Sequence, residues 1–122
     1  MIAARIDQVK FPFFKGVSAA GSSDIFNNIY CYNALTLEVS GSTAVSLKVQ
    51  GCINTEDVNK QPIPDVNLEW TDLGIINLSD FSVTASATSN GIYSVTIAGI
   101  AKVRVVLESV TGSTTVIGVM EA

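Results

Sequence analysis

Apolar and polar residues alternate along most of the chain from Asn33 onward, and this pattern strongly limits the possible secondary structure. In residues 34–40, ALTLEVS, three apolar side chains fall on one side and the polar ones between them on the other. Successive side chains of a strand point to opposite faces of a sheet, so a period of two is typical of a half-buried strand. No segment has a clear helical period. The chain is therefore predicted to be all-β.

The alternation recurs at intervals of about 8–12 residues, which is typical of an antiparallel sandwich or barrel. We expect hairpins at Gly41-Ser42 and at residues 111–113, a turn at residues 99–101 and about seven strands in all. The predicted fold over residues 33–122 is a β-sandwich with jelly-roll or immunoglobulin-like topology. The residues expected to face its core are Leu35, Leu37, Val39, Val45, Leu47, Val49, Trp70, Leu73, Ile75, Ile76, Leu78, Phe81, Val83, Ala85, Ala87, Tyr93, Val95, Ile97, Val103, Val105 and Leu107.

Two segments of this domain need separate comment. Residues 54–67 interrupt the alternation with Pro62 and Pro64, which cannot donate to a strand ladder, so they form the longest predicted loop. Residues 114–120, TTVIGVM, form an uncharged strand that would be prone to aggregation if its edge were free. We expect this last strand to be paired, either within the sheet or with a neighbouring subunit.

The first 32 residues mix aromatic, small and polar side chains without a sustained period. They are predicted to be an irregular N-terminal arm, separate from the domain at 33–122, with one weak turn of helix at residues 22–28. Its aromatic residues must be buried either against the domain or against another subunit. In the second case they form a partner-binding site, and its predicted members are Phe11, Phe13, Phe14 and Phe26.

Length and charge limit the class of protein. A chain of 122 residues is the size of one domain. Its seven basic residues are scattered and the net charge is −4, which does not favour nucleic-acid binding. No apolar run approaches the roughly 20 residues of a membrane-spanning helix. We also see no secretory signal, so we expect synthesis in a host cytoplasm and release by lysis or within an assembly.

The residues that usually carry chemistry are few. The chain has no histidine, and its close carboxylate pairs, Glu56 with Asp57 and Glu69 with Asp72, lie in or beside turns. Oxygen ligands for calcium are present in the long loop without a known spacing, and they are Asn54, Glu56, Asp57 and Asp65. Cys31 and Cys52 are expected to be free thiols. We therefore predict no enzymatic activity, no metal and no cofactor.

Several segments together resemble a family of small β-rich structural proteins encoded in the morphogenesis regions of tailed phages and prophages. The segments are LEVSGSTAVSLKVQGCIN, the strand of Trp70, the Gly91-x-Tyr93 strand, the strand Val103-Arg104-Val105 and the hairpin Thr111-Gly112 with Val116. The likeness covers about residues 34–120. It implies a virion component that is a symmetric oligomer, and it implies no enzymatic residues.

The resemblance leads to a specific expectation. The protein would be a capsid decoration protein, head fibre base or tail accessory module, with the major capsid protein or other virion proteins as partners. An alternative is a carbohydrate-binding module for host adhesion that uses Trp70 or Tyr93 as a stacking surface. A tail or baseplate subunit is a third interpretation and differs from the first mainly in location.

Overall fold

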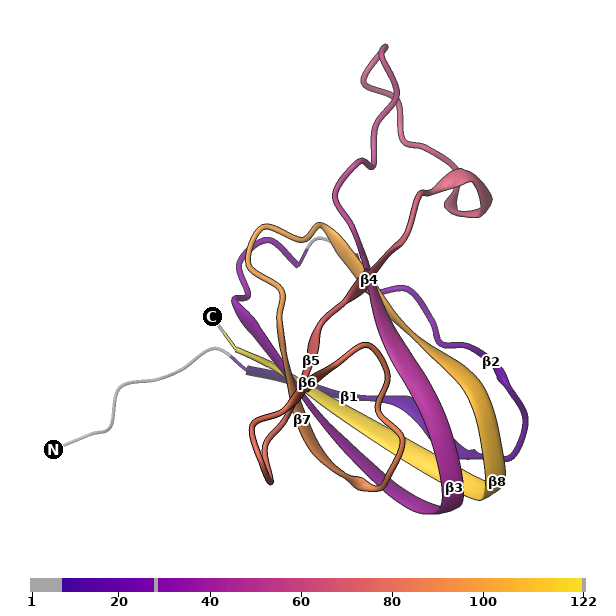
Figure 1. The fold of residues 1–122 in the computed structure, drawn as a ribbon. Coiled ribbons are helices and arrows are strands. Elements are labelled where there is room, and N and C mark those ends of the chain that lie inside the picture. Colours follow the sequence, from indigo (N-terminus) through magenta and orange to yellow (C-terminus); the bar gives the residue numbers. More distant parts are fainter. Residues whose placement is uncertain (1–7, 28, 122) are drawn as a thin grey trace, which may run out of the picture.

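The computed structural model describes residues 8–27 and 29–121 and confirms the predicted all-β, antiparallel, sandwich-like fold (Figure 1). It contains one eight-stranded sheet and a short 3-10 helix. The elements are β1 (Gln8–Val17), β2 (Gly21–Ser22), β3 (Ala34–Cys52), η1 (Asp65–Asn67), β4 (Thr71–Leu73), β5 (Ile75–Asn77), β6 (Val83–Thr84), β7 (Gly91–Thr96) and β8 (Lys102–Glu121).

Two long strands organise the whole sheet. β3 and β8 pair antiparallel along their entire length, from Ala34 opposite Glu121 to Cys52 opposite Lys102. The resulting ribbon bends sharply near its middle, at the lower right of Figure 1, so that its two halves face each other. Residues 34–40 and 114–121 join β1, β7, β5 and β6 in what we call the six-strand half. Residues 44–52 and 102–110 join β2 and β4 in the four-strand half.

The two predicted hairpins are therefore wrong, although the chain does change direction at both places. Residues on either side of Gly41-Ser42 pair with β8 and not with each other, and the residues around 111–113 pair with β3. Gly41 has φ +84° and Gly112 has φ +81°, in the left-handed region where a Cβ is unfavourable. The ladder has register shifts between Ser40 and Ala44. Glycine and irregular pairing thus bend an existing ribbon here.

The core lies between the two halves of the folded sheet. The alternation predicted from sequence is confirmed for β3, β7 and the first half of β8, whose inward residues are buried and form one cluster. These residues are Leu35, Leu37, Val39, Val45, Leu47, Val49, Tyr93, Val95, Ile97, Val103, Val105 and Leu107. A single core therefore stabilises both halves.

The prediction fails between residues 70 and 87. Ile75 and Ala87 are buried, but Trp70, Leu73 and Ile76 are only partly buried. Four residues assigned to the core are exposed, and they are Leu78, Phe81, Val83 and Ala85. The reason is that the expected long strand is replaced by a turn and the two-residue β6, so the alternation does not continue.

The N-terminal segment also differs from the prediction. Residues 8–17 form β1, an edge strand that pairs with residues 114–121 of β8. Residues 22–27 contain no helix, and Phe26 is bridged to Val103. Residues 1–7 of the predicted arm, and Asn28, lie outside the described residues. Because β8 lies between β1 and β3, the expectation that residues 114–120 are paired is confirmed within the sheet itself.

The longest loop, residues 53–70, projects from the end of the molecule opposite the bend (Figure 1). Its outer part is a small hairpin, with Glu56 bridged to Pro62 and the N–H of Ile63 donating to the carbonyl of Thr55 at 2.9 Å. At its base Leu68 is buried. We call residues 53–70 the projecting segment.

Candidate functional site

Of the carboxylates considered for catalysis, Asp57 and Asp72 serve structural roles. Asp72 accepts a hydrogen bond from Gln50 Nε2 at 2.9 Å and lies 3.5 Å from Lys48 Nζ. The Gln50 hydrogen bond and the positive charge of Lys48 lower the pKa of Asp72, although partial desolvation opposes them. A general acid needs a raised pKa, so this shift has the wrong direction for that role. Glu56, Asp57 and Glu69 are exposed.

The proposed calcium ligands do not converge. One carboxylate oxygen of Asp57 accepts hydrogen bonds from the N–H groups of Asn59 at 2.8 Å and Gln61 at 3.0 Å, which fixes the tip of the projecting segment. Asp65 lies 3.5 Å from Lys102 Nζ and ties the base of the segment to β8. Within residues 8–27 and 29–121, no group of three acidic, cysteine or histidine side chains could hold a metal.

Neither aromatic residue considered for sugar binding offers an open platform. Tyr93 is buried, and its hydroxyl donates to the carbonyl of Ser89 at 2.7 Å. Trp70 is half-buried, and the Arg104 guanidinium carbon lies 4.4 Å from its ring centroid. This cation–π contact covers one face of the indole. Arg104 also donates from Nε to Gln50 Oε1 at 2.9 Å, so Trp70 belongs to a polar network.

The phenylalanines predicted to bind a partner fold back onto the domain. Phe13 and Phe14 are buried in the core, while Phe11 and Phe26 are partly buried against it. Phe11 and Phe26 stack with ring centroids 3.8 Å apart, and Phe13 meets both edge-on. Their role toward a partner stays a prediction, and they have little exposed surface for it.

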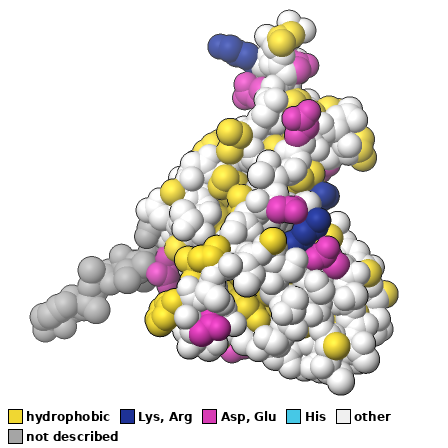
Figure 2. Space-filling view, in the orientation of Figure 1, with side chains coloured by type: hydrophobic (Ala, Val, Ile, Leu, Met, Phe, Trp, Pro, Cys, Tyr) yellow, Lys and Arg dark blue, Asp and Glu magenta, His cyan; other side chains and the backbone are white. Residues whose placement is uncertain are grey.

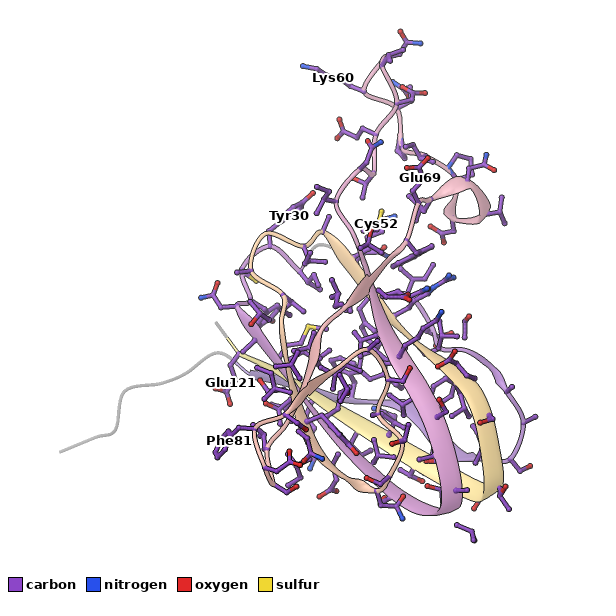
Figure 3. The ribbon with its side chains drawn as sticks, in the orientation of Figure 1. Tyr30, Cys52, Lys60, Glu69, Phe81 and Glu121 are labelled. Carbon is purple, nitrogen blue, oxygen red and sulfur yellow. The ribbon has the colours of Figure 1, made fainter. Side chains whose placement is uncertain are left out.

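The cysteines are both free, as expected. Cys31 is exposed and Cys52 is buried at the base of the projecting segment (Figure 3). Among the described residues, no helix has the length and apolar character needed to cross a bilayer.

Exposed apolar side chains are found instead on the projecting segment. Val58 is 98% exposed and Val66 91% exposed, which are extreme values for valine. Ile53 is also exposed, and Lys60 lies at the outer end (Figure 3). Val58 lies in the hairpin, which is held by its own hydrogen bonds, and Val66 lies in η1, where the N–H of Asn67 donates to the carbonyl of Pro64 at 2.8 Å, so both valines are displayed on hydrogen-bonded turns.

A second exposed apolar group lies on the outer face of the six-strand half, over β5, β6 and β7, where Figure 2 shows hydrophobic side chains gathered at the lower left. Ile76 pairs with Val83 across the ladder, and the N–H of Leu78 donates to the carbonyl of Ile92 at 3.1 Å. Phe81 lies in the turn between β5 and β6 and points away from the body (Figure 3). We call these five residues the apolar end.

The longest loop was correctly predicted at residues 54–67, but neither its exposed valines nor the apolar end was identified from the sequence as a surface. A signal for the second was present, because Ile75-Ile76 and Ile92-Tyr93 place apolar residues at consecutive strand positions. Consecutive positions point to opposite faces, so both faces must be apolar there.

Comparison with known proteins connects this fold to phages. No protein-family model and no curated protein sequence matches the chain. The SPBc2 prophage-derived protein YomS has a similar structure, with a TM-score of 0.77 and 26% sequence identity over 100% of this chain and 99% of YomS. The PBSX exported protein XepA matches with a TM-score of 0.74 and 17% identity. This chain covers 40% of XepA, and that likeness concerns the fold alone.

The full-length similarity to YomS identifies the chain as phage-related, in agreement with the resemblance noted from its sequence.

Proposed function

We propose that the protein is a non-enzymatic structural component of a phage particle, and specifically a decoration protein that binds the outer capsid lattice. The observation that carries this proposal is the similarity to a prophage-derived protein over the full length of both chains. The polar side chains considered for chemistry fit the same view, because Asp57, Asp65 and Asp72 are each engaged in holding the fold together.

The projecting segment supplies the contact with the particle. Its exposed valines, Val58 and Val66, are the type of side chain that gains most from burial in a partner, by about 1.5–3 kcal/mol for complete burial of each. The hairpin is ordered before binding, so little conformational entropy is lost. A repeated lattice would multiply such modest contacts.

The adhesion alternative has no comparable support. The ring of Tyr93 is buried, and Trp70 is packed against Arg104. The tail alternative uses the same surface and differs in the partner, so an experiment must separate the two.

The test is sedimentation of the purified protein with empty capsids and, separately, with isolated tails of the phage whose genome encodes it. We expect saturable binding to capsids with a stoichiometry set by the lattice. A Val58→Ser, Val66→Ser variant should bind at least about 100-fold more weakly, whereas Tyr30→Ser, which alters an exposed side chain outside the segment, should bind normally. Binding to tails alone would replace the capsid assignment, and binding to neither particle would overturn the proposal.

A further inference from the structure

A cavity of about 290 Å³ opens at the base of the projecting segment. Cys52 and Glu69 both line it, and Figure 3 shows them where the segment leaves the body of the molecule. Leu73, another lining residue, pairs with the core residue Val49, so the cavity lies on the inner side of the four-strand half. Ligand sites usually measure about 300–1,000 Å³, so this one has room for a single side chain or a small ligand.

The floor of the cavity is apolar. Leu73 and Ile100 meet above Gly51, where a Cβ would lie 3.0 Å from Leu73 Cδ1 and 3.1 Å from Ile100 Cγ2. Ile53 adds apolar surface at the edge and is 67% exposed. The thiol of the buried Cys52 donates to the carbonyl of Asn54 at 3.6 Å and is therefore already engaged. The floor thus offers van der Waals contact to a hydrocarbon chain.

The rim of the cavity carries three side chains with acceptor oxygens, Asn54, Glu69 and Thr71. Within residues 8–27 and 29–121, none of these side chains has a hydrogen-bond or ion-pair partner. Asn54 stands on one limb of the projecting segment, whereas Glu69 and Thr71 stand on the other limb and at its foot. Unused acceptors therefore border an apolar floor on two sides.

The charge at the rim is not compensated by the chain itself. Glu69 is the charged residue of the lining, and no lysine or arginine of the described chain lines the cavity. The basic side chains nearest in sequence to the lining residues are engaged elsewhere, Lys102 with Asp65 and Lys48 with Asp72, each at 3.5 Å. The rim therefore attracts a cation and repels an anion.

An apolar floor below a carboxylate suits a ligand with a hydrocarbon stem and a positive head. A lysine side chain has this form, with four methylene groups and an ammonium that carries three donors. The acceptors of Asn54, Glu69 and Thr71 come from two limbs of the chain, which fits three separately directed donors better than the planar fork of a guanidinium.

We propose that this cavity takes the side chain of a lysine that belongs to the protein bound by the projecting segment. The inference rests on the proposed function, because Val58 and Val66 of the same segment supply the contact with the particle. The methylene stem packs on Leu73 and Ile100, and the ammonium donates to Glu69. A charged group at a fixed place in the contact selects the partner and sets its register.

The cavity itself is tested on the purified protein, with n-butylammonium as the probe because it reproduces a lysine side chain. Amide NMR spectra should show saturable shifts at Gly51, Ile53 and Ile100 and none at Phe81, with a dissociation constant in the millimolar range. The neutral 1-butanol should bind about tenfold more weakly.

Two variants and one further probe sharpen this measurement. Glu69→Gln should lower the affinity for n-butylammonium about tenfold, whereas Glu56→Gln, which changes an exposed carboxylate of the same segment outside the cavity, should not. Shifts that do not saturate, or equal affinity for n-butylammonium and 1-butanol, would overturn the inference. Tighter binding of n-propylguanidinium would overturn the choice of lysine in favour of arginine.

The source of the ammonium group is tested by sedimentation with empty capsids. Glu69→Gln should weaken binding about tenfold, and Glu56→Gln should bind normally. Equal binding of Glu69→Gln and the unmodified protein would overturn the lysine of the particle as the ligand and leave a free amine. If the unmodified protein binds neither capsids nor tails, the proposed function fails, and saturable binding of n-butylammonium would then assign the cavity to a free amine.

Discussion

The two halves of the folded sheet share one core but have very different outer faces. On the four-strand half, the side chains of Lys48, Asp72, Gln50, Arg104 and Trp70 form a continuous network of ion-pair, hydrogen-bond and cation–π contacts. On the six-strand half, the corresponding face ends in five exposed or half-exposed apolar side chains. On the first face the polar side chains pair with one another, so this face needs no partner protein. The second leaves apolar side chains in contact with water.

We infer from this difference that one outer face contributes to the stability of the chain and the other to its interactions. Residues of the polar network should matter to the isolated chain, while residues of the apolar end should matter to its assembly. The following changes test that division, beginning with the core that both halves share.

Phe14→Ala should give the largest effect. Phe14 is 7% exposed in the shared core, and truncation of a buried phenylalanine costs about 3–5 kcal/mol. Because one core supports both halves, urea denaturation should show a single transition at lower midpoint, with amide exchange accelerated in both halves. Exchange accelerated only in β1 and the adjoining part of β8 would show that the halves unfold separately.

Gly118→Ala should follow. A Cβ at Gly118 would lie 2.5 Å from Phe13 Cε2 and 3.2 Å from Phe11 Cε2, so the rings must shift. Overpacking of this kind costs about 1–3 kcal/mol. Thermal denaturation measures it, with Gly21→Ala as the control, since no atom lies within 4 Å of a Cβ at Gly21. Equal stability of the two variants would contradict the close packing of Phe13.

Arg104→Ala tests the polar face. It removes the contact with Trp70 and the hydrogen bond to Gln50, and we expect a loss of about 1 kcal/mol. Tryptophan fluorescence should shift to the red as the indole is uncovered. Arg104→Lys keeps the charge but not the planar donor geometry and should recover only part of the loss. An unchanged emission spectrum would argue against the stacking.

Phe81→Asn tests the apolar end. Unlike the preceding changes, it should not lower the stability of the monomer. Phe81 has a φ of +60°, which asparagine tolerates better than phenylalanine, so the monomer should gain about 0.5 kcal/mol or be unchanged. Thermal denaturation of the purified protein is the appropriate measurement. A loss above about 1 kcal/mol would mean that Phe81 stabilises the monomer, against the division drawn above.

Acidification should produce the smallest effect. The pKa of Asp72 is lowered by Gln50 and Lys48, so its contribution to stability is present above its ordinary pKa of 3.8 and is lost as pH falls through the lower, folded-state value. Urea midpoints at about pH 7 and about pH 3 should differ more for the unmodified protein than for Asp72→Asn. Identical pH dependence in the two proteins would show that Asp72 does not stabilise the fold through this network.

Strands β3, β7 and β8 and most of the core were predictable because they depend on local pattern, whereas β1 and the segment between residues 70 and 87 were not predicted correctly. Leu35, Leu37 and Val39 alternate with polar residues, and so do Val103, Val105 and Leu107, and each set is buried as expected. Phe81 and Val83 were placed in the core wrongly, because the same apolar residues can line an inner or an outer face. The candidate surfaces were missed for this reason, since exposure depends on which strands become neighbours.

The sequence alone determined that this chain forms a sheet and which side of β3, β7 and the first half of β8 is buried, because side-chain alternation is fixed by the geometry of each strand. Only the tertiary structure decided that Gly41 and Gly112 bend one long ribbon and do not close two hairpins. A glycine turn permits either arrangement, and the choice rests on pairing between residues such as Ala34 and Glu121, which are distant in the chain. The same long-range pairing placed the polar network on one outer face and left the apolar end exposed on the other.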